Sequence, residues 1–463
     1  MKLAILGGGG VRMPAFVRAV LSGHAQAFEE IALFEPDPYR RETIGRLAVE
    51  LAGVLGHPGV VSVTPDVEEA FTRADFVFSA IRVGGDRGRV VDEQVALRRG
   101  VVGQETTGPG GCAMALRTIP VVLDYAATLA RVAPRAVLIN FTNPAGIVTQ
   151  ALSSHATVRA VGVCDTPSGT VERLARFLGA TDGGWSYSYG GLNHLGWITS
   201  FTVGGEERIA ELLASYERLV AFDHRFAAFD PALVRRVGAI PTEYVYYYYD
   251  PTRYVDGVAH AGSSRGQDVE RLNTELLAGI AKAFETGDVN DAWATYELLL
   301  GVRRDTYMRT DVDGDSGQGG ARAARESHGP ARLEHARLGG YEGIALQVIE
   351  GLGSGNAGEV IVNTRNGSSL GFLEPDDVVE VPALVHAGGI APLATDGLSR
   401  SARALVAQVK EYERATVEAA VTGDGELAAL ALALHPLVPG VSVAREMMAE
   451  YRELHGSHLA YLH

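Results

Sequence analysis

Lys2-Leu-Ala-Ile-Leu-Gly-Gly-Gly-Gly10 decides the fold, because a short apolar run of strand length leads directly into four consecutive glycines. The residues from Met13 onward then show the apolar spacing of a helix, although Arg12 stands where the usual pattern has a third glycine. Glycines between a strand and a helix let backbone N–H groups approach a pyrophosphate, and an acid ending the next strand favours NAD over NADP. The alternative is a tight turn without a ligand. The predicted cofactor-binding residues are Gly7, Gly9, Gly10, Glu35 and Asp37.

Further apolar segments of strand length follow, with helical patterns between most of them. The segments are residues 31–35, 60–63, 76–80, 136–140 and 160–164, and the helical patterns include 13–21, 40–55 and 113–132. Strands that alternate with helices form a parallel sheet wound on both faces, and ligands bind beyond the carboxyl ends of its strands. We therefore predict an α/β fold, a Rossmann-like doubly wound parallel sheet with a second α+β domain, arranged as in lactate and malate dehydrogenases.

The domain boundary is expected where the alternating pattern ends. We assign residues 1–165 to an NAD-binding domain and 166–463 to a domain for substrate binding, metal binding and oligomerisation, since 463 residues are too many for one ordinary core. Within the second part, residues 303–340 have the composition of a surface loop, and 399–422 have the pattern of a long amphipathic helix.

The overall composition narrows the class of partner. A formal net charge of -15 argues against nucleic acid and against an anionic membrane surface. The two cysteines are too few for a disulfide framework, which favours a reducing compartment. The chain shows neither the pattern of a secretory signal nor an apolar run of about 20 residues, so we expect a cytoplasmic protein.

A thiol and an imidazole follow the sixth predicted strand. Cys164 closes that strand, and His194 lies in Gly191-Leu-Asn-His194. This pair suits a soft or borderline divalent ion, and two protein ligands would leave positions open for a Lewis-acid role. Spacing alone favours the alternative, in which both side chains are structural. Cys112 is interpreted as a buried small residue near the start of a helix.

Two other segments have a structural and a chemical interpretation. Residues 244–249 are rich in tyrosine, which indicates core packing unless a nearby cation makes one phenol a base. Residues 82–89 place three arginines after a strand, either as a solvated loop or as a site for phosphate or carboxylate. Arg265 begins a helical segment and is ambiguous by itself.

Together these motifs resemble glycoside hydrolase family four, the NAD- and metal-dependent 6-phosphoglycosidases, over most of the chain. The segments that carry the resemblance are Ile81-Arg-Val-Gly-Gly85, Asp92-Glu93, Gly103-Gln-Glu-Thr-Thr-Gly-Pro-Gly-Gly111, Asn140-Phe-Thr-Asn-Pro144, Cys164-Asp165, Gly191-Leu-Asn-His-Leu195 and the tyrosine-rich run. Val362-Asn-Thr-Arg-Asn366 and Leu373-Glu-Pro-Asp-Asp377 are most similar to the 6-phospho-β-glucosidase branch. This family is an exception to hydrolysis by two carboxylates.

The resemblance implies roles for individual residues. Cys164 and His194 would hold the metal, usually manganese, and Tyr244 would be the base. Arg89 and Asn143 would contact the phosphosugar, and Arg265 would bind its phosphate. An acid at Asp165, where the β-specific branch often has asparagine, would protonate the leaving group as in the α-specific branch, so a 6-phospho-α-glucosidase is an alternative.

The implied reaction uses NAD without net oxidation. Hydride leaves C3 of the sugar for NAD, the C2 proton is removed, and the C1 substituent is eliminated before water adds and the hydride returns. The implied substrate is a phosphorylated disaccharide or another 6-phosphoglucoside, and the implied assembly is a homodimer or homotetramer.

Two readings from other classes compete with a glycosidase. An NAD-dependent hydroxy-acid dehydrogenase would require an Asp–His pair in the second domain, and no convincing pair is found. A catalytically silent NAD-binding protein would need none of Cys164, His194 and Tyr244.

Overall fold

The computed structural model describes residues 1–181, 183–305 and 341–463, and its first part contains a six-stranded parallel arrangement. The strands are β1 (Lys2–Leu6), β2 (Glu30–Phe34), β3 (Val61–Thr64), β4 (Phe76–Ser79), β5 (Val137–Asn140) and β6 (Arg159–Gly162). They lie in the order β6-β5-β4-β1-β2-β3, which is the order of dinucleotide-binding sheets. The predicted fold class is confirmed.

Helices connect these strands, and the three predicted helical patterns 13–21, 40–55 and 113–132 all fall on helical segments. The helices are α1 (Met13–His24), α2 (Pro38–Arg40), α3 (Arg46–Val54), α4 (Val67–Phe71), α5 (Gly85–Leu97), α6 (Pro109–Val132) and α7 (Ala145–His155), with the 3₁₀ segment η1 (Ala25–Ala27) and the π-helical segment η2 (Arg41–Gly45). Helix α6 begins four residues before the predicted pattern, because Pro109 fits the first helical turn and Gly108 enters it with φ +75°.

The sheet continues into the second part of the chain without a break. The added strands are β7 (Trp185–Leu192), β8 (Leu195–Val203), β9 (Glu206–Glu207), β10 (Ile240–Pro241), β11 (Gly358–Arg365), β12 (Val378–His386) and β13 (Gly389–Pro392). Strand β11 pairs antiparallel with β6 at Asn363 and Gly162, and β12 bridges β11 to β7. Because one sheet spans both parts, the domain boundary at residue 165 stays a prediction.

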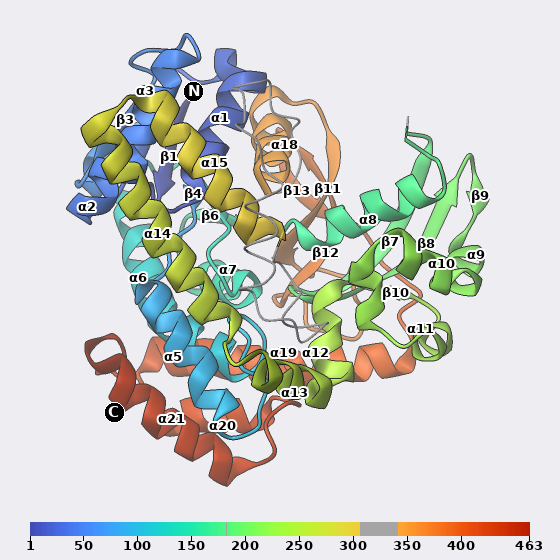
Figure 1. Cartoon of the computed structure of the whole chain (residues 1–463). Helices are drawn as coiled ribbons and strands as arrows, with labels where there is room; N and C mark the ends of the chain where they lie inside the picture. Colours follow the sequence, from blue (N-terminus) through green and yellow to red (C-terminus); the bar gives the residue numbers. More distant parts are fainter. Residues whose placement is uncertain (182, 306–340) are drawn as a thin grey trace.

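The remaining helices surround this extension and return to the first part. They are α8 (Thr166–Phe177), α9 (Ile209–Ala214), α10 (Tyr216–Phe222), α11 (Pro231–Val237), α12 (Tyr246–Tyr249), α13 (Pro251–Ala261), α14 (Arg265–Thr286), α15 (Val289–Asp305), α18 (Tyr341–Ser354), α19 (Arg400–Thr422), α20 (Gly425–Leu434) and α21 (Val441–His455), with η3 (His224–Ala228), η4 (Glu243–Val245) and η5 (Gly456–His458). Figure 1 shows α14 and α15 lying over the N-terminal part, and α19 to α21 lying beneath α5 and α6.

Two sequence predictions about this part have different outcomes. The long amphipathic helix is confirmed as α19, whose N-cap Ser399 accepts a hydrogen bond from the backbone of Ala402. The predicted surface loop is wrong at its start, because α15 continues through Asp305 and therefore includes Arg303. The rest of that predicted loop, residues 306–340, lies outside the described residues.

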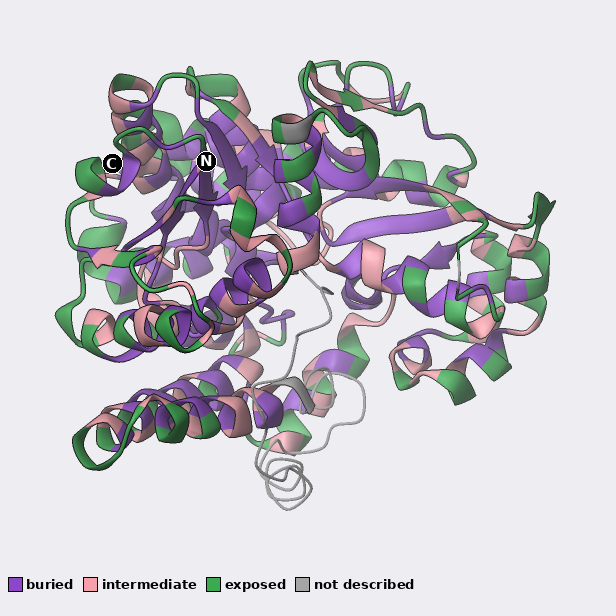
Figure 2. Ribbon diagram, turned by 90° about the horizontal axis from the view of Figure 1, so that it is seen from above, coloured by how far each residue is buried: buried purple, intermediate pink, exposed green. Residues whose placement is uncertain are grey.

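The core extends across the two parts, because each of its two largest clusters of buried side chains contains residues from both. Figure 2 shows buried strands at the centre and helices exposed on their outer faces. A buried ion pair in the first part also contacts the C-terminal helix. Arg117 on α6 donates to both oxygens of Asp92 on α5, at 2.6 and 2.7 Å. His455 on α21 lies 2.8 Å from the same carboxylate. Each charged group therefore has partners, as burial requires.

Helix α6 is, among the described residues, the one helix long and apolar enough to span a membrane by length and composition. It packs against α5, α7 and α19, and its most apolar window is 61% buried inside the fold. Core helices of globular proteins pass the same test, so this is weak evidence for a membrane span.

His435 provides a prediction about stability and pH. Burial at the end of α20 lowers the pKa of His435 to about 3, whereas an imidazole in an unfolded chain has a pKa of about 6.5. Between these values the unfolded chain binds a proton that the folded chain does not, so the free energy of unfolding falls as pH falls. His435→Asn should remove this loss, narrowing the stability difference between about pH 7.5 and pH 5 by roughly 2 kcal/mol in urea unfolding. If the variant lost as much stability between these two pH values as the unmodified protein, the lowered pKa of His435 would not be the cause of the loss.

Candidate active site

The glycine loop and the end of β2 form one structure. Gly7 has φ +86°, and a side chain there would meet the Ala80 carbonyl oxygen at 2.7 Å. The backbone N–H of Gly9 donates to Glu35 Oε2 at 3.0 Å, and a Cβ on Gly9 would lie 2.6 Å from that oxygen. The loop can therefore approach Glu35 only because it lacks side chains. A bare loop ahead of α1, beside a buried carboxylate, fits the pyrophosphate and ribose of a dinucleotide.

The two acids after β2 have different partners. Glu35 also accepts the backbone N–H of Asp37 at 3.0 Å, whereas Asp37 caps α2 by accepting the N–H of Arg40 at 2.8 Å. The guanidinium of Arg40 donates to the Gly9 carbonyl oxygen at 3.1 Å. Arg12 is exposed at the N-cap of α1. Glu35 therefore binds the glycine loop, whereas the side chain of Asp37 caps helix α2.

Cys164 lies between the end of β6 and the start of α8. Burial raises the pKa of its thiol well above the usual value, and Glu380 and Asp165 raise that pKa further, against the influence of Thr166. The thiol is therefore protonated unless a cation lies beside it. Asp165 occupies the N-cap of α8 and is partly exposed, without a capping hydrogen bond from its side chain.

His194 lies in the two-residue turn between β7 and β8, with φ +62°. Its Nδ1 is 2.8 Å from Thr106 Oγ1. Burial lowers the pKa of His194 to about 4, against the opposite influence of Glu105, so the ring is neutral near pH 7. Neutral imidazole is the form that binds metal ions.

The turn that carries His194 and the loop that carries Cys164 share a neighbour, Glu380 on β12. Asn193 donates to Glu380 Oε1 at 3.0 Å, and the charge of Glu380 acts on the thiol. Among the described residues, no group of three or more His, Cys, Asp or Glu side chains is arranged to hold a metal. A metal at Cys164 and His194 would therefore have two protein ligands, and this donor set fits a divalent transition-metal ion with open positions.

Glu380 itself was not found by sequence reasoning. It also accepts Tyr189 OH at 2.6 Å and Asn363 Nδ2 at 2.9 Å. Burial raises its pKa to about 7, although these hydrogen bonds lower it. The available signal was a glutamate inside an otherwise apolar strand, but its partners come from β7, β11 and the turn before β8, which spacing does not reveal.

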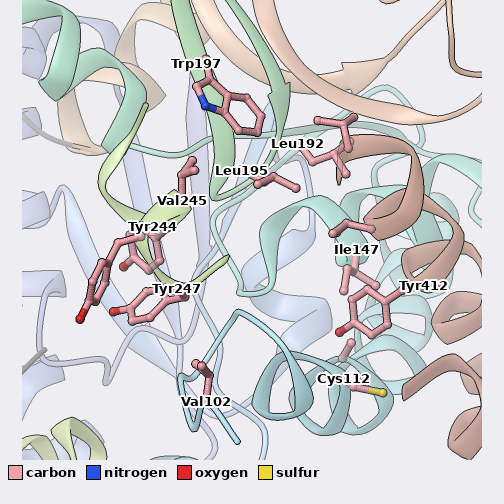
Figure 3. Close-up of a cluster of buried hydrophobic side chains, with 14 of the residues drawn as sticks. Val102, Cys112, Ile147, Leu192, Leu195, Trp197, Tyr244, Val245, Tyr247 and Tyr412 are labelled. Atoms are coloured by element: carbon pink, nitrogen blue, oxygen red, sulfur yellow. The ribbon is translucent and has the colours of Figure 1, made fainter. Parts of the chain in front are cut away.

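Tyr244 lies against His194, one of the two candidate metal ligands. Its ring stacks on His194 with centroids 3.8 Å apart and planes 7° from parallel. Tyr247 lies next to it, as Figure 3 shows, and is fully buried against Tyr254. Tyr248 instead approaches His435. The predicted base therefore lies against a predicted metal ligand.

Cys112 is buried in the same core, where Figure 3 places it beside Tyr412. Its sulfur lies 3.9 Å from Thr416 Oγ1. Its interpretation as a packing residue is confirmed.

Arg89 lies at the centre of a buried charge network. It donates from Nε to Glu93 at 2.7 Å and pairs from Nη1 with Glu105 at 2.9 Å, and Glu105 also accepts Arg82 at 2.7 Å. Burial opposes the charge of Arg89, but Glu105, Glu93 and Tyr244 together raise its pKa above the usual value. Although burial would raise the pKa of Glu105, Arg89, Arg82 and a third arginine hold it well below its usual range. Glu105 is a second residue whose role sequence reasoning missed, although it lies in one of the quoted motifs.

Arg265, the arginine predicted to bind the phosphate, lies at the start of α14. Arg265 occupies the first helical position and donates to the Arg303 carbonyl oxygen at 2.7 Å. Burial and the cationic neighbours Arg12, Arg265 and Arg89 together lower the pKa of Arg303 to about 9. A cluster of arginines that lowers the pKa of Arg303, beside the N-terminus of a long helix, suits an anionic ligand.

The two asparagines of the 140–144 motif have different roles. Asn140 is fully buried and organises its own loop, donating to Thr149 Oγ1 at 3.1 Å and accepting the Thr142 N–H at 3.1 Å. Asn143 is partly exposed, and within the described ranges its side chain makes no hydrogen bond. Asn143 is therefore the member of this motif that is able to bind a ligand.

Comparison with known families accounts for most of the chain. The description "Family 4 glycosyl hydrolase" matches residues 2–180, and "Family 4 glycosyl hydrolase C-terminal domain" matches residues 189–438.

Curated relatives are similar over nearly their whole length. A probable 6-phospho-β-glucosidase of Bacillus subtilis is 29% identical, with 99% of this chain and 97% of that protein covered. The 6-phospho-α-glucosidase 1 of Lacticaseibacillus paracasei is 27% identical, with 97% and 96% covered.

Solved structures agree with these matches. The 6-phospho-β-glucosidase of Thermotoga maritima, solved with manganese, NAD+ and glucose-6-phosphate, has a TM-score of 0.78 and 25% identity, covering 98% of both chains. A malate dehydrogenase of Plasmodium falciparum, at 11% identity and a TM-score of 0.50, covers 92% of this chain and 99% of its own and shares the fold alone.

Proposed function

The chain belongs to family 4 of the glycosyl hydrolases, and we propose that it hydrolyses 6-phospho-β-glucosides with NAD and a divalent metal ion, manganese by preference. The observation that carries this proposal is the stack of Tyr244 on His194, in a turn that shares the neighbour Glu380 with the loop of Cys164. Relatives and solved structures that act on 6-phosphoglucosides, including one that contains manganese and NAD+, support the same assignment.

Each cofactor would bind to residues already in place. The loop Gly7, Gly9 and Gly10 would face the pyrophosphate, and Glu35 would accept hydroxyls of the ribose. Asp37 is proposed as a more distant contact, since α2 uses its side chain. When bound, NAD supplies a hydride acceptor for C3 of the sugar, and the metal supplies a Lewis acid for the adjacent oxygens.

The chain's own residues would then move protons. Once C3 is oxidised, the proton on C2 becomes acidic, and Tyr244 is the base that we assign to it. The charge of Arg89 acts on this phenol and favours its deprotonated form. Asp165, partly exposed beside Cys164, would protonate the departing oxygen at C1. Water would then add at C1 and a proton would return to C2. Return of the hydride to C3 would let the sugar leave at its original oxidation state.

The phosphate would bind at Arg89 and Arg265, and Asn143 would be a further contact to the phosphosugar. Glu93 links the two arginines, because it accepts Arg89 and also the Gly266 N–H of α14, at 2.6 Å. A buried carboxylate thus holds one guanidinium next to a helix N-terminus, and both attract an anion.

Replacing Arg265 tests the phosphate site. Arg265→Gln should raise KM for a 6-phosphoglucoside about 10- to 100-fold, since a charge-assisted hydrogen bond contributes about 1.5–3 kcal/mol. Arg271→Gln, on the same helix but paired with Asp268 and Glu275, is the matched control. An equal rise in KM in both variants would contradict a specific contact.

The decisive test of function is turnover of nitrophenyl 6-phosphoglucosides, α and β, gluco and galacto, with and without NAD and manganese. We expect hydrolysis that needs both cofactors, no accumulation of NADH, and exchange of the C2 proton with solvent. EDTA should abolish turnover, and manganese should restore it best. Equal activity with zinc or without metal would contradict the proposal, and α-selective turnover would assign the enzyme to the other anomer.

A simple hydroxy-acid dehydrogenase is the second candidate, since such an enzyme shares the fold. A dehydrogenase would form one NADH for each substrate molecule that it oxidises, and the same assay measures NADH. We also propose a cytoplasmic location, on the basis of the bacterial metabolic enzymes among the relatives, and a homodimer or homotetramer, to be tested by sedimentation.

A further inference from the structure

A chain of buried hydrogen bonds leads from Gln104 to His194. The side-chain oxygen Oε1 of Gln104 accepts three donors: the backbone N–H of Thr106 at 2.7 Å, that of Thr107 at 2.7 Å, and Thr106 Oγ1 at 2.9 Å. Thr106 Oγ1 is in turn 2.8 Å from Nδ1 of His194. All these side chains are buried.

The position of each proton follows from what each group can donate. The Gln104 oxygen must face Thr106 and Thr107, because the reversed amide would point its NH₂ group at two backbone N–H groups. A carbonyl oxygen only accepts, so the single hydrogen of the Thr106 hydroxyl is directed at Gln104. The hydroxyl oxygen is then left as an acceptor toward His194. Nδ1 of His194 therefore carries the ring proton, and Nε2 carries the lone pair.

We infer that Thr106 is a positioning residue that selects the Nδ1–H tautomer of His194 and thereby prepares Nε2 to bind the metal ion. This inference rests on the proposed function, because it takes His194 as a metal ligand. A neutral imidazole has one protonated and one free nitrogen, and the hydrogen bond at one nitrogen decides which is available. Partners of this kind tune metal affinity in other proteins.

The surrounding structure holds this chain rigid. A Cβ on Gly111 would lie 2.2 Å from the Thr106 carbonyl oxygen, and one on Gly110 would lie 2.2 Å from that of Gln104. The two glycines let the first turn of α6 press against the loop and fix Thr106. On the other side, the ring of Tyr244 stacks on His194 and limits its rotation.

Two variants isolate the hydroxyl. Thr106→Val keeps the shape of the side chain and removes its oxygen, whereas Thr106→Ser keeps the oxygen. Thr107→Val is the matched control, because the Thr107 hydroxyl is buried and has no hydrogen-bond partner in the described part of the chain. We expect Thr106→Val to weaken Mn²⁺ binding about 10- to 100-fold, as for other partners of ligating histidines. The serine variant and Thr107→Val should stay within about threefold of the unmodified protein, with NAD affinity unchanged in all three.

The tautomer can be measured directly in the unmodified protein. In the metal-free protein, long-range ¹H–¹⁵N spectra of ¹⁵N-histidine should show Nδ1 of His194 protonated and Nε2 unprotonated, and His194→Gln would assign the signal. A protonated Nε2 would overturn the inference even if Thr106→Val did not fold. Unchanged Mn²⁺ affinity in a folded Thr106→Val would also overturn it. Failure of the unmodified protein to bind Mn²⁺ would instead refute the metal site, and with it the proposed function, while the tautomer remains measurable.

Discussion

Cys164→Ser should abolish turnover, lowering kcat by about 1,000-fold or more, while NAD binding stays near that of the unmodified protein. A Lewis acid contributes several kcal/mol to such a reaction, and each 1.36 kcal/mol is a factor of ten in rate. A serine hydroxyl does not ionise to replace the thiolate, so the ion would lose one of its two proposed protein ligands. The glycine loop lies at the ends of other strands, which is why NAD should still bind.

The control for this substitution is Cys112→Ser. Cys112 is the other buried thiol, packed near Thr416, and it has no place in the proposed chemistry. The Cys112→Ser variant should turn over substrate at a normal rate and should lose only a modest amount of stability. Mn²⁺ binding, NAD binding and kcat should be measured on both variants. Turnover of Cys164→Ser at the normal rate under chelation would refute the metal assignment.

Tyr244→Phe should lower kcat about 100- to 10,000-fold, the usual contribution of a general base, and should abolish exchange of the substrate's C2 proton with solvent. The phenylalanine ring can keep the stack on His194, so binding of Mn²⁺ and NAD should change little. The measurement is deuterium incorporation at C2, followed by NMR, beside steady-state kinetics. A structural role alone would change stability without a selective loss of exchange.

Tyr248→Phe is the matched control, because Tyr248 belongs to the same run but its hydroxyl lies near His435, 3.5 Å away. It should retain C2 exchange. If Tyr248→Phe lost exchange and Tyr244→Phe kept it, the base would be misassigned within the run.

The fold was predictable because its signals are local. A strand, a glycine loop and a helix are read from adjacent residues, and the alternation of apolar segments with helices gave the parallel sheet and the place of its ligand edge. The resemblance added Cys164, His194 and Tyr244 through motifs, each of which is also local. The continuation of the sheet through β11 and β12 was not predicted, since antiparallel pairing depends on segments about 200 residues apart.

The features of the site can also be divided into those that the sequence determines and those that depend on tertiary contacts. The sequence by itself determined which chemical groups are present: a loop without side chains, a thiol, an imidazole, a phenol and several arginines. Only the tertiary structure decided what each group touches, as when Thr106 meets His194 across 88 positions and Glu380 joins Asn193 to Asn363. Protonation, tautomer and charge depend on those contacts and on burial, and spacing along the chain carries no information about either.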